Sequence, residues 1–261
     1  MSTTLSLERT FRLGLASIAS HLSWAWVALS SVAIAALFGG QYIEGLSTVA
    51  ARTPEVDSAA SVFSHRAWPI EGGLILHIVF ASLALALGPW QFSRWLRTRH
   101  PRVHRVMGRA YLSAVALGAV GGIVTSIYST LGLKGFFGFA ALDVLWGWTA
   151  YRAYRAVRAR NFREHEAWMI RNFALTYAAV TLRLEFALLL LVQLPFQAPG
   201  GFAHAYDQAY GSLPYVAWIP NLVIAEFIIR SRNLPALRMT DPTRPVEVAQ
   251  ETAASAGSVP A

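Results

Sequence analysis

Residues 72–92 read GGLILHIVFASLALALGPWQF, and His77 is the only ionisable side chain in this run of 21 positions. A helix of about 20 residues rises about 30 Å, which matches the thickness of the hydrocarbon core of a bilayer. The run therefore predicts a membrane-spanning helix. How often such runs recur along the chain decides the rest of the fold.

The composition of the whole chain is typical of a membrane protein. Of its 261 residues, 55% are hydrophobic and 14% are charged, whereas about 25% are charged in a water-soluble domain. Further apolar runs lie at 18–38, 106–128, 136–157, 168–192 and 213–229. The sequence predicts an all-α bundle of six transmembrane helices over 18–230, a cytoplasmic segment at 1–17 and a largely disordered cytoplasmic tail at 231–261. The absence of Cys excludes disulfides, iron–sulfur clusters and thiol nucleophiles.

Basic residues predict the orientation, because loops that stay in the cytoplasm are enriched in Lys and Arg. Eighteen of the 22 Lys and Arg lie in the N-terminal segment, the connections after the second and fourth spans, and the tail; three lie on the opposite side. Both termini are therefore predicted to be cytoplasmic. Anionic lipid headgroups account for the net charge of +8, with Arg105, Arg109 and Arg171 as candidate contacts, and this distribution argues against nucleic-acid binding.

Five polar residues on four predicted spans fall in one layer, at depths of roughly 8–14 Å from the external boundary. They are His77, Asp143, Arg183, Glu185 and Asn221. Ionisable groups at membrane depth pair with one another or face a cavity. Because Arg183 and Glu185 are two positions apart, they point to opposite sides of their helix and cannot pair. We predict that Arg183 pairs with Asp143 and that the other three complete a ligand-binding cavity. A polar clamp that only fixes helix packing is the alternative.

A second polar group is predicted at the cytoplasmic side, where His104 enters the third span and His165 enters the fifth. Two imidazoles that face each other across a bundle are what bis-histidine ligation of haem b needs. One His with a nearby carboxylate, Glu164 or Glu166, would suit a metal ion. The simpler interpretation is that these His and the adjacent Arg bind lipid phosphates.

Small residues recur every four positions on the third predicted span, at Ala110, Ala114, Gly118 and Gly122. Such a stripe predicts a close helix–helix contact within the chain. The glycine-rich stretch 132–138 is expected to form a short external turn, and the connection 193–212 is expected to form an external loop.

Several short motifs resemble those of one family. They are His77 with Gly88-Pro-Trp-Gln91 and Arg94; His104-Arg-x-x-Gly108-Arg109-x-Tyr111; and His165-x-x-Trp168-Met-Ile-Arg171-Asn-x-Ala174-Leu-Thr176, followed by Arg183. In combination they resemble the bacterial multi-pass membrane proteins of domain-of-unknown-function family 2306, from the second to the fifth or sixth span. The resemblance implies an integral protein of a bacterial inner membrane. It also implies that His77, His104, His165 and Arg183 belong to the shared pattern. It implies no activity.

Three functions fit these features. The first is a polytopic protein that binds or passes a small solute or a proton at the outer polar layer, although no predicted span is interrupted by a central Pro, as spans of many transporters are. The second is a membrane redox protein, like a cytochrome b561 bundle, with haem b at His104 and His165 or a quinone beside His77 and Arg183. The third is a non-catalytic assembly or scaffold protein. The sequence contains no serine elbow, HExxH motif or phosphate loop, so it does not favour an enzyme.

Overall fold

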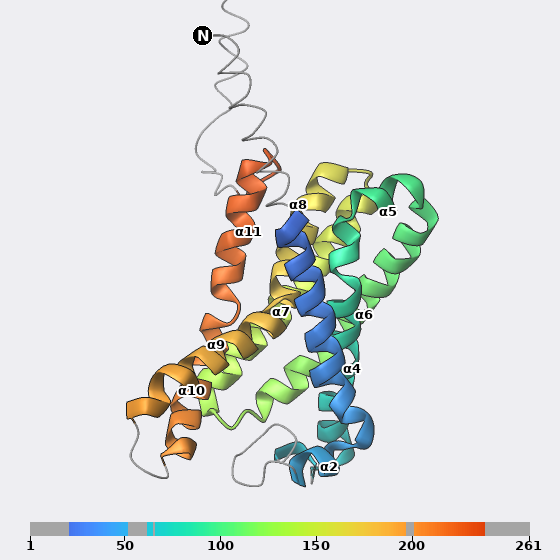
Figure 1. Ribbon diagram of the computed structural model, residues 1–261. Coiled ribbons are helices and arrows are strands. Elements are labelled where there is room, and N and C mark those ends of the chain that lie inside the picture. The colour runs from blue at the N-terminus through green and yellow to red at the C-terminus, as the bar shows by residue number, and fades with distance from the viewer. Residues whose placement is uncertain (1–20, 52–61, 65, 197–200, 238–261) are drawn as a thin grey trace, which may run out of the picture.

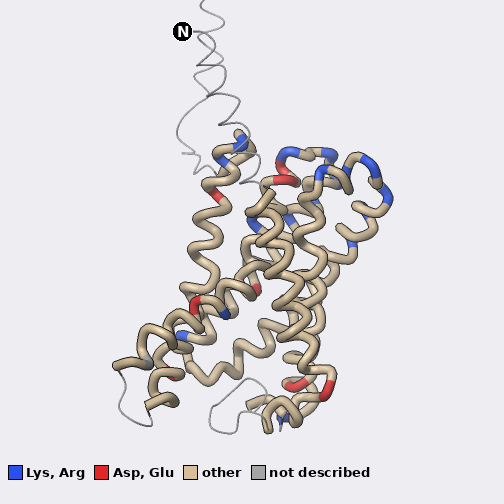
Figure 2. Tube along the Cα trace, viewed as in Figure 1, with Lys and Arg blue, Asp and Glu red and all other residues tan. Residues whose placement is uncertain are grey.

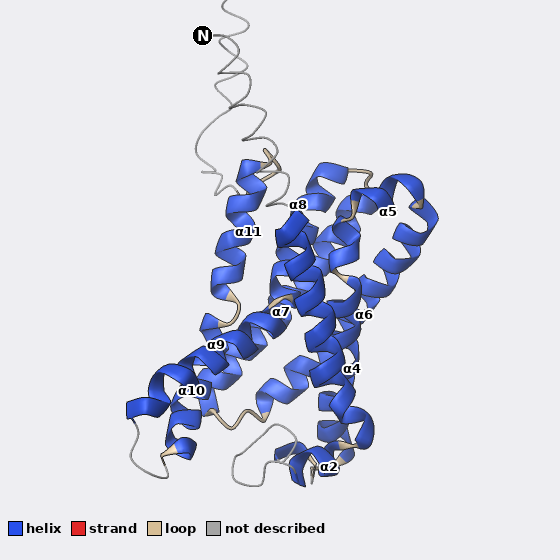
Figure 3. Ribbon diagram, viewed as in Figure 1, coloured by secondary structure: helices blue, strands red, loops and turns tan. Residues whose placement is uncertain are grey.

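The computed structural model describes residues 21–51, 62–64, 66–196 and 201–237. The predicted cytoplasmic segment 1–17 and the tail beyond residue 237 lie outside the described residues. Within the described ranges every regular element is a helix, as Figures 1 and 3 show. The prediction of an all-α fold is confirmed.

The helices follow one another with short connections. The first helix, His21–Glu44, ends in the π turn η1 (Ala35–Gly39) and the 3-10 turn η2 (Gln41–Glu44). The later elements are α2 (Leu46–Ala51), α4 (Trp68–Leu87), η3 (Pro89–Phe92), α5 (Arg94–Arg99), α6 (Pro101–Ile127), α7 (Gly132–Arg158), α8 (Phe162–Thr176), α9 (Ala178–Gln193), η4 (Leu194–Phe196), α10 (Phe202–Val216) and α11 (Ile219–Ser231).

Five stretches are long and apolar enough to cross a membrane: His21–Glu44, Trp68–Phe92, Pro101–Ile127, Phe162–Gln193 and Phe202–Ser231. They correspond to five of the six predicted spans. The remaining predicted span, 136–157, coincides with α7. This helix has 27 residues but is not among the five. Its charged residues, among them Lys134, Asp143 and Arg152, lower its hydropathy. It nevertheless packs between α6 and α8 within the bundle.

Two of the five spans are each built from two short helices. The span Phe162–Gln193 breaks at Tyr177, between α8 and α9, and the last span breaks at Ala217 and Trp218, between α10 and α11. Figure 1 shows α9 running obliquely to the upright helices. Pro214 lies inside α10 and Pro220 lies in the first turn of α11. Proline removes a backbone donor and disfavours a helix in front of it, which explains the second break.

The expectation of spans without a central Pro is therefore wrong. The last span begins at Phe202, in the segment expected to be an external loop, so Pro214 and Pro220 fall near its middle. α10 buries a stripe of small and apolar residues but exposes His204, Asp207 and Gln208. These exposed polar residues lower the mean hydropathy of α10, which hides it from a search for apolar runs.

The small residues of α6 allow close contact with α7 and α4. A Cβ atom at Gly118 would lie 3.0 Å from the Trp146 side chain, and one at Gly122 would lie 2.3 Å from the Asp143 carboxylate. A Cβ atom at Gly121 would lie 2.5 Å from the backbone oxygen of Gly73 on α4. The predicted contact within the chain is confirmed for Gly118 and Gly122.

The glycine-rich stretch 132–138, expected in a turn, instead forms the first turns of α7. Gly132 has a φ of 60°, so the helix begins at a residue without a side chain, where this backbone conformation is unstrained. A Cβ atom at Gly138 would lie 2.4 Å from Pro214. Gly138 therefore serves the packing of α7 against α10.

The surface of the bundle suits a bilayer. Large apolar side chains are exposed on several helices; for example, Trp26 is 60% exposed, Leu191 70% and Phe227 69%. Figure 2 shows that Lys and Arg gather at one end, around α5, the end of α7, the start of α8 and the end of α11. Exposed apolar sides and a basic end are what a helical membrane protein presents to hydrocarbon and to headgroups.

Candidate functional site

Arg183 on α9 carries a charge with no carboxylate partner among the described residues. Its Nη1 atom donates a hydrogen bond to the backbone oxygen of Ala179 at 2.6 Å, and its Cζ atom lies 4.3 Å from the centre of the Phe38 ring. None of the ion pairs between described residues includes Arg183 or Asp143. The predicted Arg183–Asp143 pair is therefore wrong, because Asp143 faces Gly122 on α6 instead.

Aromatic residues from three elements surround Arg183. The hydroxyl groups of Tyr42 on η2 and Tyr210 on α10 lie close enough to interact electrostatically with its guanidinium group. Phe186, one turn further along α9, makes edge contacts with Tyr206 at 5.0 Å and with Tyr210 at 6.3 Å between ring centres. Sequence reasoning missed these tyrosines, because Tyr42 lies beyond the predicted first span 18–38, and Tyr206 and Tyr210 lie in the predicted external loop 193–212.

His77 on α4 also belongs to this layer, since it interacts electrostatically with Arg183. Its Nδ1 atom lies 2.9 Å from the backbone oxygen of Gly118, and its ring meets the Trp146 ring edge-on at 6.3 Å. Because a carbonyl oxygen only accepts, Nδ1 is the donor, and Nε2 is the acceptor of the neutral ring. His77 thus connects α4 to both α6 and α7.

The two acidic residues of the layer have no ionic partner in the described part of the chain. Asp143 is 4% exposed and makes no hydrogen bond with a described residue. One carboxylate oxygen of Glu185, Oε2, is enclosed and lacks a hydrogen bond. A carboxyl group without a partner inside a membrane costs free energy. Residues of this kind therefore often mark functional sites.

Asn221 connects the two broken spans. Its side-chain amide donates hydrogen bonds to the backbone oxygen of Ala174 at 3.1 Å and to the Thr181 hydroxyl at 3.0 Å. The Thr181 hydroxyl in turn lies 2.7 Å from the backbone oxygen of Ala217. The oxygens of Ala174 and Ala217 are groups that a helix break deprives of a partner. The predicted ligand-binding residue Asn221 therefore holds the breaks together.

A buried network between this layer and the basic end joins α6, α7 and α8. Sequence reasoning missed this network. The Tyr111 hydroxyl donates to Asn172 Oδ1 at 2.7 Å and lies 2.8 Å from the Thr176 hydroxyl. Trp146 Nε1 also donates to Thr176 at 2.8 Å, and the Asn172 amide donates to the Thr149 hydroxyl at 2.8 Å. The motifs that carry the family resemblance contain Tyr111, Asn172 and Thr176, and this was the available signal.

At the basic end, the predicted pair His104 and His165 is brought together, close enough for an electrostatic interaction. His165 Nδ1 donates to the backbone oxygen of Ala153 at 2.8 Å, which leaves Nε2 as the acceptor of the neutral ring. The Nδ1 atom of His104 and the amide nitrogen of Gln91 are buried without hydrogen bonds. This end thus combines two imidazoles with polar atoms that have no partner.

The carboxylates expected beside these histidines form ion pairs with arginines, and Glu166 also interacts electrostatically with His165. Glu164 accepts hydrogen bonds from Arg152 at 3.3 Å and from Trp168 Nε1 at 3.2 Å, and Glu166 pairs with Arg232 at 3.3 Å. Among the described residues no group of three or more His, Cys, Asp or Glu is placed to hold a metal ion.

Arg171 is not a lipid contact. It is 3% exposed and forms a two-point ion pair with Glu226 on α11. The prediction is wrong for this residue, because α8 is buried from Ala167 onwards, where it packs against α11. Arg105 and Arg109 are exposed, and their contact with headgroups stays a prediction.

A comparison with known protein families identifies the family of this chain. Residues 74–229, more than half of the chain, match the family described as "Predicted membrane protein (DUF2306)". The chain belongs to this family. No curated protein and no solved structure matches this chain. The DUF2306 region begins in α4 and ends in α11, so it contains His77, His104, His165 and Arg183. The first helix, which supplies Phe38 and Tyr42 to the surroundings of Arg183, lies outside the matched region.

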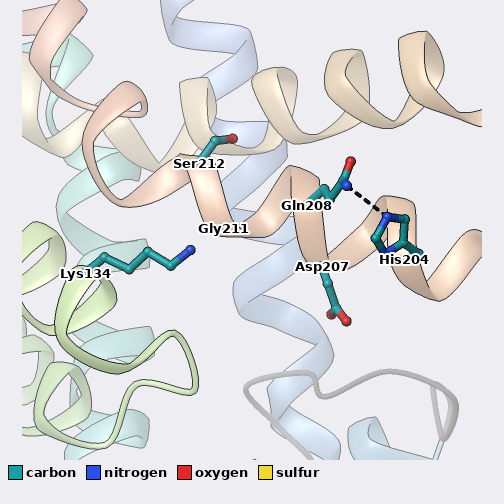
Figure 4. A pocket seen from close by; sticks show the side chains of 6 residues that line it. All are labelled: Lys134, His204, Asp207, Gln208, Gly211 and Ser212. Carbon is teal, nitrogen blue, oxygen red and sulfur yellow. Dashed lines mark hydrogen bonds between the residues drawn. The ribbon is translucent and has the colours of Figure 1, made fainter.

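The DUF2306 region also forms an open hollow of about 480 Å³ between the start of α7 and α10. Lys134, His204, Asp207, Gln208, Gly211 and Ser212 line it. Figure 4 shows the Lys134 side chain extending towards α10, and His204 bonded to Gln208 at 2.8 Å. The hollow lies at the end of the bundle opposite the arginine-rich end. Its lining residues fall in segments that the sequence analysis predicted to be a turn and a loop.

Proposed function

We propose that this DUF2306 protein binds a small solute in the outer half of the membrane and passes it across. The observation that carries the proposal is the pair of broken spans. The α8/α9 break and the α10/α11 break lie side by side, and the side chains of Asn221 and Thr181 join them. In many secondary transporters, discontinuous helices near the bilayer midplane form the substrate site.

The charges beside the breaks support this proposal over a scaffold role. Arg183 lies about one and a half turns beyond Tyr177, and it has no ionic partner among the described residues. Asp143 and Glu185 are likewise unpaired. An ionisable side chain at membrane depth costs several kcal/mol, and a scaffold gains nothing from three of them.

The proposal includes an orientation. The arginine-rich end faces the cytoplasm of a bacterial inner membrane, and both termini are cytoplasmic. The gathering of Lys and Arg at one end of the bundle supports it, because cytoplasmic loops retain these residues. At that end Arg105 and Arg109 contact anionic headgroups. Arg183 then lies in the outer half, and the hollow at Lys134 opens outwards.

The test is a thermal-shift screen of the detergent-purified protein with small anionic, neutral and cationic solutes and a soluble ubiquinone headgroup. At least one class is expected to raise the unfolding temperature of the wild type, because a ligand that binds only the folded state stabilises it. The shift should be lost in Arg183→Gln and retained in Arg109→Gln, an exposed control at the other end. A folded wild type that responds to no class would overturn solute binding.

A second candidate function is redox chemistry with haem b at His104 and His165. The observation that favours it is their juxtaposition, with His165 oriented by Ala153 so that Nε2 is available as a ligand. Bound haem would supply one-electron transfer. A Soret band that sharpens with dithionite and disappears in His165→Ala is expected. Folded protein from haem-replete cells with a flat visible spectrum would exclude haem.

A further inference from the structure

We infer that the solute bound in the outer half is a carboxylate attached to an apolar group, anchored by Arg183 between Tyr42 and Tyr210. This inference rests on the proposed solute site and names its substrate class. Its basis is the convergence of η1–η2, α9 and α10 on one guanidinium group that forms no ion pair with a carboxylate in the described part of the chain.

The hydrogen bonding of Arg183 leaves donors for a ligand. A guanidinium group has five N–H donors, and Arg183 makes one hydrogen bond to the described residues, from Nη1 to the backbone oxygen of Ala179 on its own helix. Phe38 lies 4.3 Å from Cζ and covers the group from one side. A planar guanidinium group binds carboxylates best through two parallel hydrogen bonds, and elsewhere in this chain Arg171 does so with Glu226. Arg183 has the same chemistry available without a carboxylate in the described chain.

The neighbours of Arg183 favour an anion over a cation. Tyr42 and Tyr210 contribute hydroxyl groups that can donate, and they interact electrostatically with the guanidinium group from two different elements. His77 interacts with the same charge from α4. Glu185, the nearest acidic residue in sequence, points to the other side of α9, because it lies two positions from Arg183. A cationic ligand would meet a fixed positive charge there.

The rest of the surroundings is aromatic. Phe186 is three positions after Arg183 and so lies on the same face of α9, where it contacts Tyr206 and Tyr210. Tyr206 and Tyr210 stack at 6.1 Å on α10, and the Phe38 ring lies against the Arg183 guanidinium group. Aromatic walls bury apolar or planar groups. A carboxylate that carries such a group matches both parts of the site.

The experiment compares three probes of nearly equal shape on the detergent-purified protein: benzoate, benzamide and benzylamine. Titration calorimetry is expected to show binding of benzoate, and neither of the other two should compete with it. Arg183→Lys keeps the charge but cannot form the two parallel hydrogen bonds, so it should lower the affinity for benzoate roughly tenfold. Tyr42→Phe and Tyr210→Phe keep the rings but remove the hydroxyl groups. Each should lower the affinity for benzoate roughly tenfold. These conservative variants keep the inference testable if Arg183→Gln does not fold.

Each result separates the inference from the proposed function. Binding of benzamide or benzylamine that Arg183→Lys weakens, with no binding of benzoate, would overturn the carboxylate class and leave an outer solute site. Benzoate affinity that is unchanged in all three conservative variants would overturn Arg183 as its anchor and make the aromatic cluster a packing feature. No binding of any of the three would overturn the inference, while a response to another class in the wider screen would still support solute binding.

Discussion

Arg171 on α8 and Glu226 on α11 form a two-point ion pair in the interior of the bundle, with Nε–Oε1 and Nη2–Oε2 distances of 2.5 and 3.0 Å. Arg171 is 3% exposed and Glu226 28%. α11 meets α8 through a small apolar cluster that includes Ala225 and Ile229. The ion pair therefore supplies a large part of the specific attachment of α11 to the bundle.

Glu226→Gln is expected to lower the free energy of unfolding by about 2–4 kcal/mol, because it leaves the buried Arg171 charge without compensation. Denaturant unfolding in detergent measures the change. The matched control is Glu166→Gln, which removes the exposed pair with Arg232 and should cost less than about 1 kcal/mol. Equal losses in the two variants would show that Glu226 is solvated and that the pair does not attach α11.

Tyr111→Phe is expected to destabilise the protein by about 1–2 kcal/mol. The substitution keeps the ring but removes the hydroxyl that bonds Asn172 and Thr176, and so leaves Asn172 Oδ1 buried without its donor. Tyr154→Phe is the control, since Tyr154 is 48% exposed. Thermal unfolding monitored by circular dichroism would compare the two. A Tyr111 variant as stable as the Tyr154 variant would contradict a structural role for the network.

The sequence was sufficient to predict the membrane helices whose residues are apolar all round, because hydropathy averages over a helix without regard to its faces. It failed at α10, where the buried stripe of Ala205, Ala209 and Leu213 alternates with exposed polar residues. It also missed the break before α11, although Pro220 stands near the middle of the predicted span 213–229, where a proline kinks or breaks a helix. Because 193–212 was assigned to a loop, only the second part of this broken span was predicted.

The spacing of the polar residues along each helix could be predicted, since the rise per residue is fixed, but their partners could not. Partners depend on the rotation of each helix about its axis and on the bends at Tyr177 and Ala217. These turn Asp143 towards α6 and Arg183 towards Phe38, so two charges in one predicted layer do not meet. Arg171, predicted at the lipid surface, is buried because α11 covers it.

Gly121→Ala is expected to destabilise the protein by about 1–3 kcal/mol, because the new methyl group would lie 2.5 Å from the backbone oxygen of Gly73 and force α4 away from α6. Gly147→Ala is the control with the same change in composition and helix propensity. Its Cβ atom would meet Ala119 at 3.6 Å, an ordinary contact. If both variants unfold at the same temperature, the close approach of α4 and α6 is absent from the folded protein.

Lys134 tests the orientation directly, because it is the only Lys in the chain. It lies in the first turn of α7, whose last turn carries Arg155 and Arg158 at the basic end. If that basic end is cytoplasmic, a membrane-impermeant amine reagent should modify Lys134 in intact spheroplasts.

Mass spectrometry of the peptide that contains residue 134 separates this modification from that of the N-terminal amine, and Lys134→Arg gives the background. Modification that requires detergent would place Lys134 on the cytoplasmic side. The outer layer would then lie in the inner half of the bilayer, and Arg183 would be reached from the cytoplasm.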